Sequence, residues 1–192
     1  MTEMSAAPAF FQQAVASLTS SRPRPEIELH EVQAPKRIAP WAYALAAEAT
    51  GPAGELATAR LVLLYDPDSY EAWNGVLRLV VYLRASLDAE VAADPLLPAV
   101  GWSWLTDALE SCGTTCTALG GTVTLTSSAR FGEISGPPRT HHLELRSSWT
   151  PSDEHLEPHA AAFCELLASA TGLPPEGVSV LNPREGAAPR HG

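Results

Sequence analysis

Two long apolar segments joined by a short turn constrain the fold of this chain more than any other feature. Residues 57–65 form a strand-length run that is apolar enough for a central position in a sheet. Residues 66–69 (DPDS) follow as a turn, because Asp and Pro favour turn geometry. Residues 73–85 then alternate, with leucines and a valine on one face and, on the other, Val76, Arg78, Val80, Tyr82 and Arg84. A short link requires antiparallel pairing, so these segments predict the centre of an antiparallel sheet.

The rest of the chain predicts a single α+β domain. Apolar residues at helical spacing predict helices over residues 8–19, over 95–112 and from 158 onward. Alternation predicts further strands at residues 26–30, 41–47, 122–126 and 143–149. The element order is therefore helix, four strands, helix, two strands, helix. It predicts a mostly antiparallel sheet of about six strands with helices on one face. We expect this domain to span residues 8–181, between disordered tails at 1–7 and 182–192.

The charge balance excludes several classes of function. The net charge of −10 argues against coating nucleic acid or binding anionic membranes, since both require many cations. Lys36 is the only lysine among the 12 basic residues, and it lies in a proline-bounded loop. Neither a phosphate loop ending in Gly-Lys nor a kinase lysine on a strand is therefore possible. No GxGxxG motif is present either, so we expect no cofactor.

The N-terminus and the cysteines predict a cytoplasmic protein. Glu3 precedes the first apolar segment, and Gln12 and Gln13 interrupt it, so no signal peptide is expected. No window approaches the ~18 apolar residues of a membrane-spanning helix. The three cysteines are an odd and sparse set, which is not a disulfide framework.

Residues suited to catalysis or metal binding are few. His155 and His159 are four apart, but Pro158 lies between them and marks a helix start, so we expect two solvent-exposed side chains rather than zinc ligands. His141 and His142 are adjacent on a strand and point to opposite faces. One hypothesis is a small-molecule enzyme with acids and His141 or His142 in a cleft. The sequence assigns no catalytic residue and no metal ligand.

The uncovered face of the sheet supports the leading hypothesis, a non-enzymatic binding or adaptor domain. With helices on one face, Val80 and Tyr82 lie exposed on the other, among Arg78 and Arg84. Trp102 lies at the margin of the apolar stripe of the helix over residues 95–112, where an amphipathic ring often meets a partner. A protein or peptide partner is expected here, or a second copy of the chain.

A local basic cluster supports a second hypothesis, an RNA-associated accessory factor. Four basic residues bracket the first strand, namely Arg22, Arg24, Lys36 and Arg37. Such a cluster can hold an acidic peptide, a phosphate or an RNA backbone. The alternative interpretation is neutralisation of the nearby Glu26, Glu28 and Glu31.

Four segments of the chain resemble a known family: RPEIELHEVQAPKRIAPWAYAL, ARLVLLYDPDSYEAWNGVLRLVVYLRA, AADPLLPAVGWSWLTDAL and LELRSSWTP. They are similar to the actinobacterial family known as domain of unknown function 3000, from about Pro8 to Leu181. The resemblance implies an uncharacterised protein with no assigned activity or cofactor. The predicted element order also resembles that of small acidic secretion chaperones, which bind peptide segments as dimers, although a fold alone does not imply a function.

Overall fold

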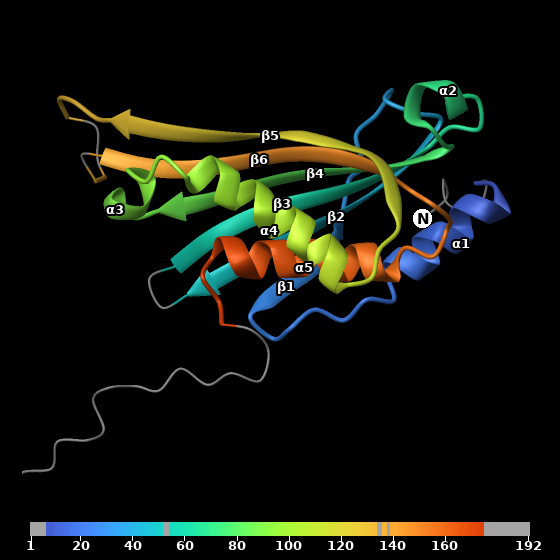
Figure 1. The fold of residues 1–192 in the computed structure, drawn as a ribbon, viewed down its shortest axis with the longest axis horizontal. Helices are drawn as coiled ribbons and strands as arrows, with labels where there is room; N and C mark the ends of the chain where they lie inside the picture. Colours follow the sequence, from blue (N-terminus) through green and yellow to red (C-terminus); the bar gives the residue numbers. More distant parts are fainter. Residues whose placement is uncertain (1–6, 52–53, 134–135, 138, 175–192) are drawn as a thin grey trace, which may run out of the picture.

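A computed structural model describes residues 7–51, 54–133, 136–137 and 139–174 (Figure 1). Within these residues, six strands form one sheet, and five helices accompany it. The elements in chain order are α1 (Ala9–Leu18), β1 (Ile27–Val32), β2 (Trp41–Gly51), β3 (Gly54–Tyr65), α2 (Tyr70–Trp73), β4 (Leu77–Leu87), α3 (Ala89–Ala92), α4 (Leu97–Ser111), β5 (Cys116–Ala129), β6 (Arg139–Pro151) and α5 (Glu157–Ala170).

The sheet is antiparallel throughout, with the strand order β1-β2-β3-β4-β6-β5. The first four strands form a meander. After β4 the chain crosses through α3 and α4 and enters the sheet at its far edge as β5, and β6 then inserts between β4 and β5. This architecture confirms the predicted α+β class, the six-stranded antiparallel sheet and the order of the long elements. The two short helices α2 and α3 were not predicted.

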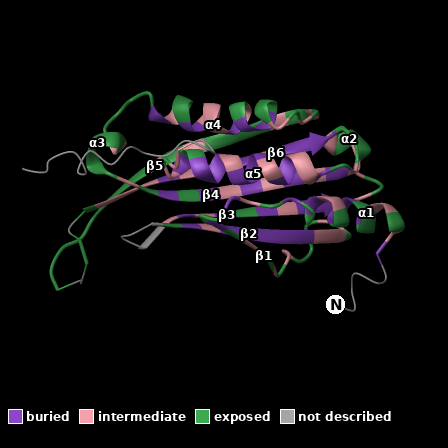
Figure 2. Ribbon diagram, turned by 90° about the horizontal axis from the view of Figure 1, so that it is seen from below, coloured by how far each residue is buried: buried purple, intermediate pink, exposed green. Residues whose placement is uncertain are grey.

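The three long helices cover one face of the sheet (Figures 1 and 2). Helix α5 packs against β2, β3 and β4, α4 packs against β5 and β6, and α1 packs against α5. Leu77, Leu79, Val81 and Leu83 of β4 are buried beneath them, as their alternation predicts. Gly101 of α4 allows a close approach to the sheet, because a Cβ there would lie 3.1 Å from Leu143 Cδ1 and 3.3 Å from Val123 Cγ1. We call the opposite side of the sheet the open face; it carries Arg60, Arg78, Val80, Tyr82, Arg84 and Arg146.

Several predicted boundaries were wrong. Trp73 belongs to the one-turn helix α2, and β4 begins only at Leu77, because Asn74 adopts a left-handed conformation (φ 57°) that ends the turn. Both β5 (14 residues) and β6 (13 residues) extend well beyond the predicted segments 122–126 and 143–149. The added residues are mostly Thr, Ser, Gly and His, whose place in a strand depends on backbone bonds to a neighbour rather than on apolar alternation.

The predicted tails fall mainly on residues that the structure does not describe, namely 1–6 and 175–192. Ala7, the first described residue, is already buried in the core. Within the described ranges, no helix combines the length and the apolar character needed to span a membrane.

Candidate binding site on the open face of the sheet

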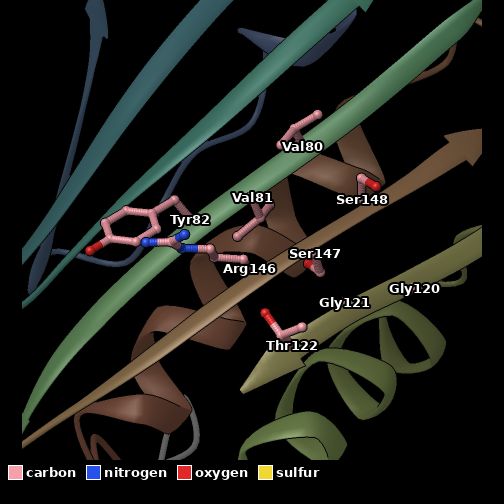
Figure 3. Close-up of a pocket in the computed structure, with 9 residues that line it drawn as sticks. All are labelled: Val80, Val81, Tyr82, Gly120, Gly121, Thr122, Arg146, Ser147 and Ser148. Atoms are coloured by element: carbon pink, nitrogen blue, oxygen red, sulfur yellow. The ribbon is translucent and has the colours of Figure 1, made fainter. Parts of the chain in front are cut away.

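The centre of the open face is a row of three side chains from three neighbouring strands. Arg60 of β3 pairs with Tyr82 of β4, and Tyr82 pairs with Arg146 of β6. The guanidinium carbon of Arg146 lies 5.4 Å from the centroid of the Tyr82 ring, which is cation–π geometry. This contact holds the aromatic ring and the charge of Arg146 side by side at the surface (Figure 3).

Shallow hollows lie on both sides of Tyr82. One has a volume of about 360 Å³ and is bordered by Val80, Gly120, Thr122, Arg146 and Ser148 (Figure 3). The other has a volume of about 340 Å³ and is bordered by His30, Val32, Ala46, Glu48, Thr58 and Arg60. Because Tyr82 lines both hollows, they form one continuous surface across all six strands, which suits an extended ligand better than a compact one.

The four arginines of this surface share it with Glu28, Glu48 and Glu144, and Glu144 lies opposite Arg84 in the strand register, but few close ion pairs form. Among the described residues, ion pairs within 4.0 Å join only Arg24 to Glu26 and Arg146 to Glu144. Arg60 and Arg84 are exposed. Arg78 is half-buried and donates hydrogen bonds to two neutral groups, Thr150 Oγ1 (3.0 Å) and Ser148 Oγ (2.6 Å). Burial lowers the pKa of Arg78, so its charge would be stabilised by an anion.

The structure brings four of the five residues that the sequence analysis proposed for a partner onto one surface. Arg78, Val80, Tyr82 and Arg84 lie together on β4 and face the open side. Trp102 lies elsewhere, because it belongs to α4 on the opposite side of the sheet and packs half-buried against the core. The five proposed residues therefore do not form a single contact surface.

Arg60 and Arg146 were not recognised in the sequence. An apolar run predicts the strand over residues 57–65 and alternation predicts the strand over residues 143–149, but neither pattern assigns a role to the polar side chains. Arg60 lies between Ala59 and Leu61, and Arg146 lies between Leu145 and Ser147. Their positions in the sequence therefore indicate that both arginines lie on the face opposite these neighbours. Their position beside Tyr82 depends on the pairing register, which a single strand does not reveal.

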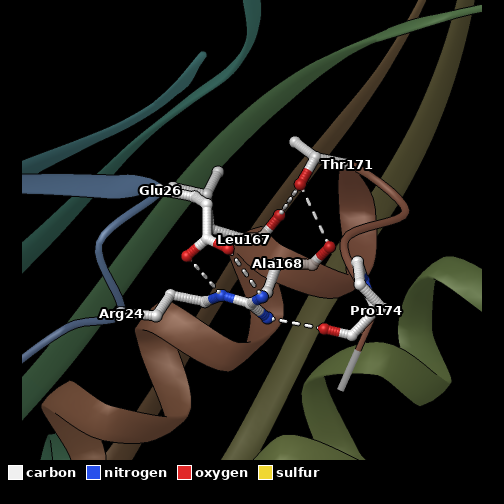
Figure 4. Close-up of polar contacts among 6 residues, drawn as sticks. All are labelled: Arg24, Glu26, Leu167, Ala168, Thr171 and Pro174. Carbon is white, nitrogen blue, oxygen red and sulfur yellow. Dashed lines mark hydrogen bonds and ion pairs between the residues drawn. The ribbon is translucent and has the colours of Figure 1, made fainter. Parts of the chain in front are cut away.

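The basic cluster around β1 is divided in the structure, because one of its members, Arg24, makes the polar contacts drawn in Figure 4. Arg24 has an exposed fraction of only 8%, donates to Glu26 Oε2 (3.1 Å) and Oε1 (3.2 Å), and also donates to the carbonyl oxygen of Pro174 (2.8 Å). The bond from Arg24 lowers the pKa of Glu26. Arg24 thus ties the segment before β1 to the end of α5, whereas Arg22, Lys36 and Arg37 are exposed.

We expect Arg24→Ala to lower the free energy of unfolding by about 2 kcal/mol, because a buried charge that makes several hydrogen bonds is lost. The matched control is Arg22→Ala, which removes an exposed arginine two residues earlier and should leave stability unchanged within about 0.5 kcal/mol. Urea unfolding followed by circular dichroism measures both variants. Equal stability of the two would show that the Arg24 contacts contribute nothing.

The prediction that His155 and His159 are both exposed was wrong for His159. Its exposed fraction is 3%, and the indole N–H of Trp149 donates a hydrogen bond to its Nδ1 (3.1 Å). Loss of solvation lowers its pKa to about 4. Pro158 does lie at the helix start, as predicted, but the first turn of α5 directs His159 into the core towards Trp149.

Other groups with catalytic potential are dispersed. His141 and His142 lie on opposite faces of β6, and His142 reaches the open face near Arg84, where burial and that charge lower its pKa. Burial also raises the pKa of all three cysteine thiols, that of Cys164 to about 12, which disfavours the reactive thiolate. Within the described ranges, no three His, Cys, Asp or Glu residues are grouped so that they could hold a metal ion.

Comparison with known proteins identifies the family and nothing more specific. A family model described as "Protein of unknown function (DUF3000)" matches residues 7–179, a range that includes every helix and strand of the structure. No curated protein and no solved structure matches the chain. Because the match spans nearly the whole chain, the protein belongs to the DUF3000 family.

Proposed function

We propose that this protein is a non-enzymatic binding domain, and that it holds an acidic segment of a protein partner across the open face. The observation that carries the proposal is the row Arg60–Tyr82–Arg146, flanked by Arg78 and Arg84. Among the described residues, three of these four arginines make no ion pair within 4.0 Å, although Glu144 lies opposite Arg84 in the strand register. A partner that supplies carboxylates would compensate these charges, and Tyr82 would provide an apolar contact between them.

The overall charge of the protein adds to the selectivity of such a site. At −10 the chain repels acidic partners at long range, so attraction acts only close to the arginines, within a Debye length of about 8 Å at physiological ionic strength. Acidic partners without a complementary apolar contact would then bind weakly. The three free thiols are consistent with a reducing, cytoplasmic setting for this function.

The same face keeps an RNA-associated role as the second candidate function. An aromatic ring beside arginines on an open sheet can stack unpaired bases and contact the backbone phosphates. Arg22, Lys36 and Arg37 of the basic cluster around β1 are exposed, so they could also contact RNA. RNA binding through either surface would weaken steeply with salt.

A selection from a random peptide library displayed on phage tests the proposal directly. Peptides are selected on the wild-type protein and counter-selected on the double variant Arg60→Glu/Arg146→Glu. We expect the enriched peptides to be rich in Asp and Glu. Fluorescence anisotropy should show that the double variant binds them at least tenfold more weakly, because like charges facing one another across an interface cost several kcal/mol.

The matched control is Arg22→Glu/Lys36→Glu, which makes the same change in net charge away from the open face. It should bind the selected peptides as the wild type does. Enriched peptides without acidic residues, or an equal loss of affinity in both double variants, would refute the proposal. A labelled oligouridine is the second probe, and its loss of binding in Arg22→Glu/Lys36→Glu alone would favour the RNA role.

A further inference from the structure

The two edges of the sheet are protected to different degrees. An edge strand carries unpaired backbone groups, and proteins guard it with charged residues, prolines or a short length. The β1 edge has all three, because it is six residues long, contains Glu28 and Glu31, and lies between prolines at positions 25 and 35. The β5 edge has no comparable protection over Gly120–Ala129, where ten consecutive residues include neither a charge nor a proline.

The outer side of β5 is uncovered in the part of the chain that the structure describes. Only β6 pairs with it, over a regular register from Gly120↔Ser148 to Ala129↔Arg139. The single irregularity lies before this stretch, at Thr117–Gly120, and Ala118 has a positive φ there. Most side chains of β5 are exposed (Figure 1 shows the strand along the edge of the sheet). The result is a regularly paired, uncharged edge about 30 Å long.

The side-chain types of this edge are nearly symmetric about Thr124 over residues 122–126 (TVTLT). Placed antiparallel to itself, the strand sets Thr122 opposite Thr126 on the open face and Val123 opposite Leu125 on the covered face. Further out, Gly120 meets Ser128 and Gly121 meets Ser127. Threonine pairs and apolar pairs opposite one another both stabilise antiparallel strands. This pairing places no charged residues of the two β5 strands opposite one another, although each copy of the chain has a net charge of −10.

The position of α4 fits the same arrangement. A Cβ at Gly101 would contact both Val123 of β5 and Leu143 of β6, so α4 passes over both strands at this residue. With neighbouring strands about 4.8 Å apart, two copies joined along β5 would bring their α4 helices close enough to pack against one another near Gly101. Trp102 follows Gly101 directly and would lie close to this joint.

We propose that the protein is a homodimer in which β5 pairs antiparallel with β5 of a second copy, with the two-fold axis at Thr124. The axis is perpendicular to the sheet, so the two six-stranded sheets join into one, and both open faces point to the same side. The two Arg60–Tyr82–Arg146 rows then lie on one surface. This inference does not depend on what the open face binds.

Charge placed on the two-fold axis tests the dimer and its register together. We expect the wild type to be a dimer in light scattering and sedimentation velocity, and Thr124→Lys and Thr124→Glu each to raise the dimer dissociation constant at least tenfold. Lys would face Lys, or Glu would face Glu, across the axis. Mixing the two variants should restore a one-to-one heterodimer in native mass spectrometry, because Lys then faces Glu.

The control is Ser86→Lys, an exposed change on the open face of β4 that should leave the dimer intact. Circular dichroism of each variant confirms that it is folded. A wild type that stays monomeric at concentrations up to a few hundred micromolar would overturn the proposal, as would dimers of unchanged affinity in Thr124→Lys. Failure of the mixed variants to pair would overturn the axis at Thr124.

Discussion

Lowering the pH from 7 to 4 is expected to reduce the free energy of unfolding by about 3 kcal/mol through one buried histidine. His159 is enclosed by the core and accepts the indole N–H of Trp149 at Nδ1. Burial is the main reason that its pKa falls from 6.5 to about 4; nearby His155 adds to the shift and Asp153 opposes it. A proton on Nδ1 would also break the bond to Trp149, since that nitrogen could no longer accept.

The direction of the effect follows from which state binds the proton first. The unfolded chain takes up a proton on this histidine near pH 6.5, whereas the folded protein does so only near pH 4. The stabilisation by neutral His159 is therefore complete above pH 6.5 and is lost progressively as the pH falls towards 4. Other groups, including Glu26, add their own losses at lower pH.

The variant His159→Asn isolates this contribution, because Asn does not titrate and its side-chain oxygen can still accept a hydrogen bond. Urea unfolding at pH 7 and at pH 4 should show a stability difference about 3 kcal/mol smaller in this variant than in the wild type. His155→Asn, an exposed change four residues earlier, should keep the wild-type difference. The same pH dependence in all three proteins would mean that His159 titrates normally.

The fold was predictable where burial imposes a repeating pattern on the sequence. The leucines of β4 alternate because one side of the strand is covered by helices, and this pattern was sufficient to predict the strand and its neighbours. The outer halves of β5 and β6 have polar residues on both faces, and these form strands only because each pairs with the other. The helices α2 and α3 are four residues long, too short to show a helical repeat.

The candidate site was predictable strand by strand but not across strands. Tyr82, Arg78 and Arg84 were found because they share a face of β4. Arg146 joins them because β6, rather than β5, pairs with β4, and no local pattern specifies that order. Arg24 was grouped with exposed basic residues by proximity in the chain, but its partner Pro174 lies 150 residues away. A charge cluster identified in the sequence can therefore combine side chains that stabilise the fold with exposed side chains that could bind a partner.

Gly120 and Gly121 of β5 are adjacent in the sequence, but only the structure shows which of them has no room for a side chain. We expect Gly121→Ala to lower the free energy of unfolding by about 3 kcal/mol, at the upper end of the usual cost of overpacking. A Cβ at this position would lie 2.8 Å from Ser147 Cβ and 2.9 Å from Ser147 Cα, and closer still to the carbonyl oxygen of Arg146. These atoms belong to β6, which is held by β4 on its other side and cannot move away.

The neighbouring variant Gly120→Ala is the matched control, because a Cβ there meets no atom within 4 Å. Alanine is also preferred over glycine in a strand, so this change should be neutral or stabilise the protein by up to about 1 kcal/mol. Chemical unfolding of the two variants at a fixed protein concentration measures the contrast. Similar stabilities would mean that β5 can shift away from β6, and the close approach of the two strands at Gly121 would then not be a fixed feature of the fold.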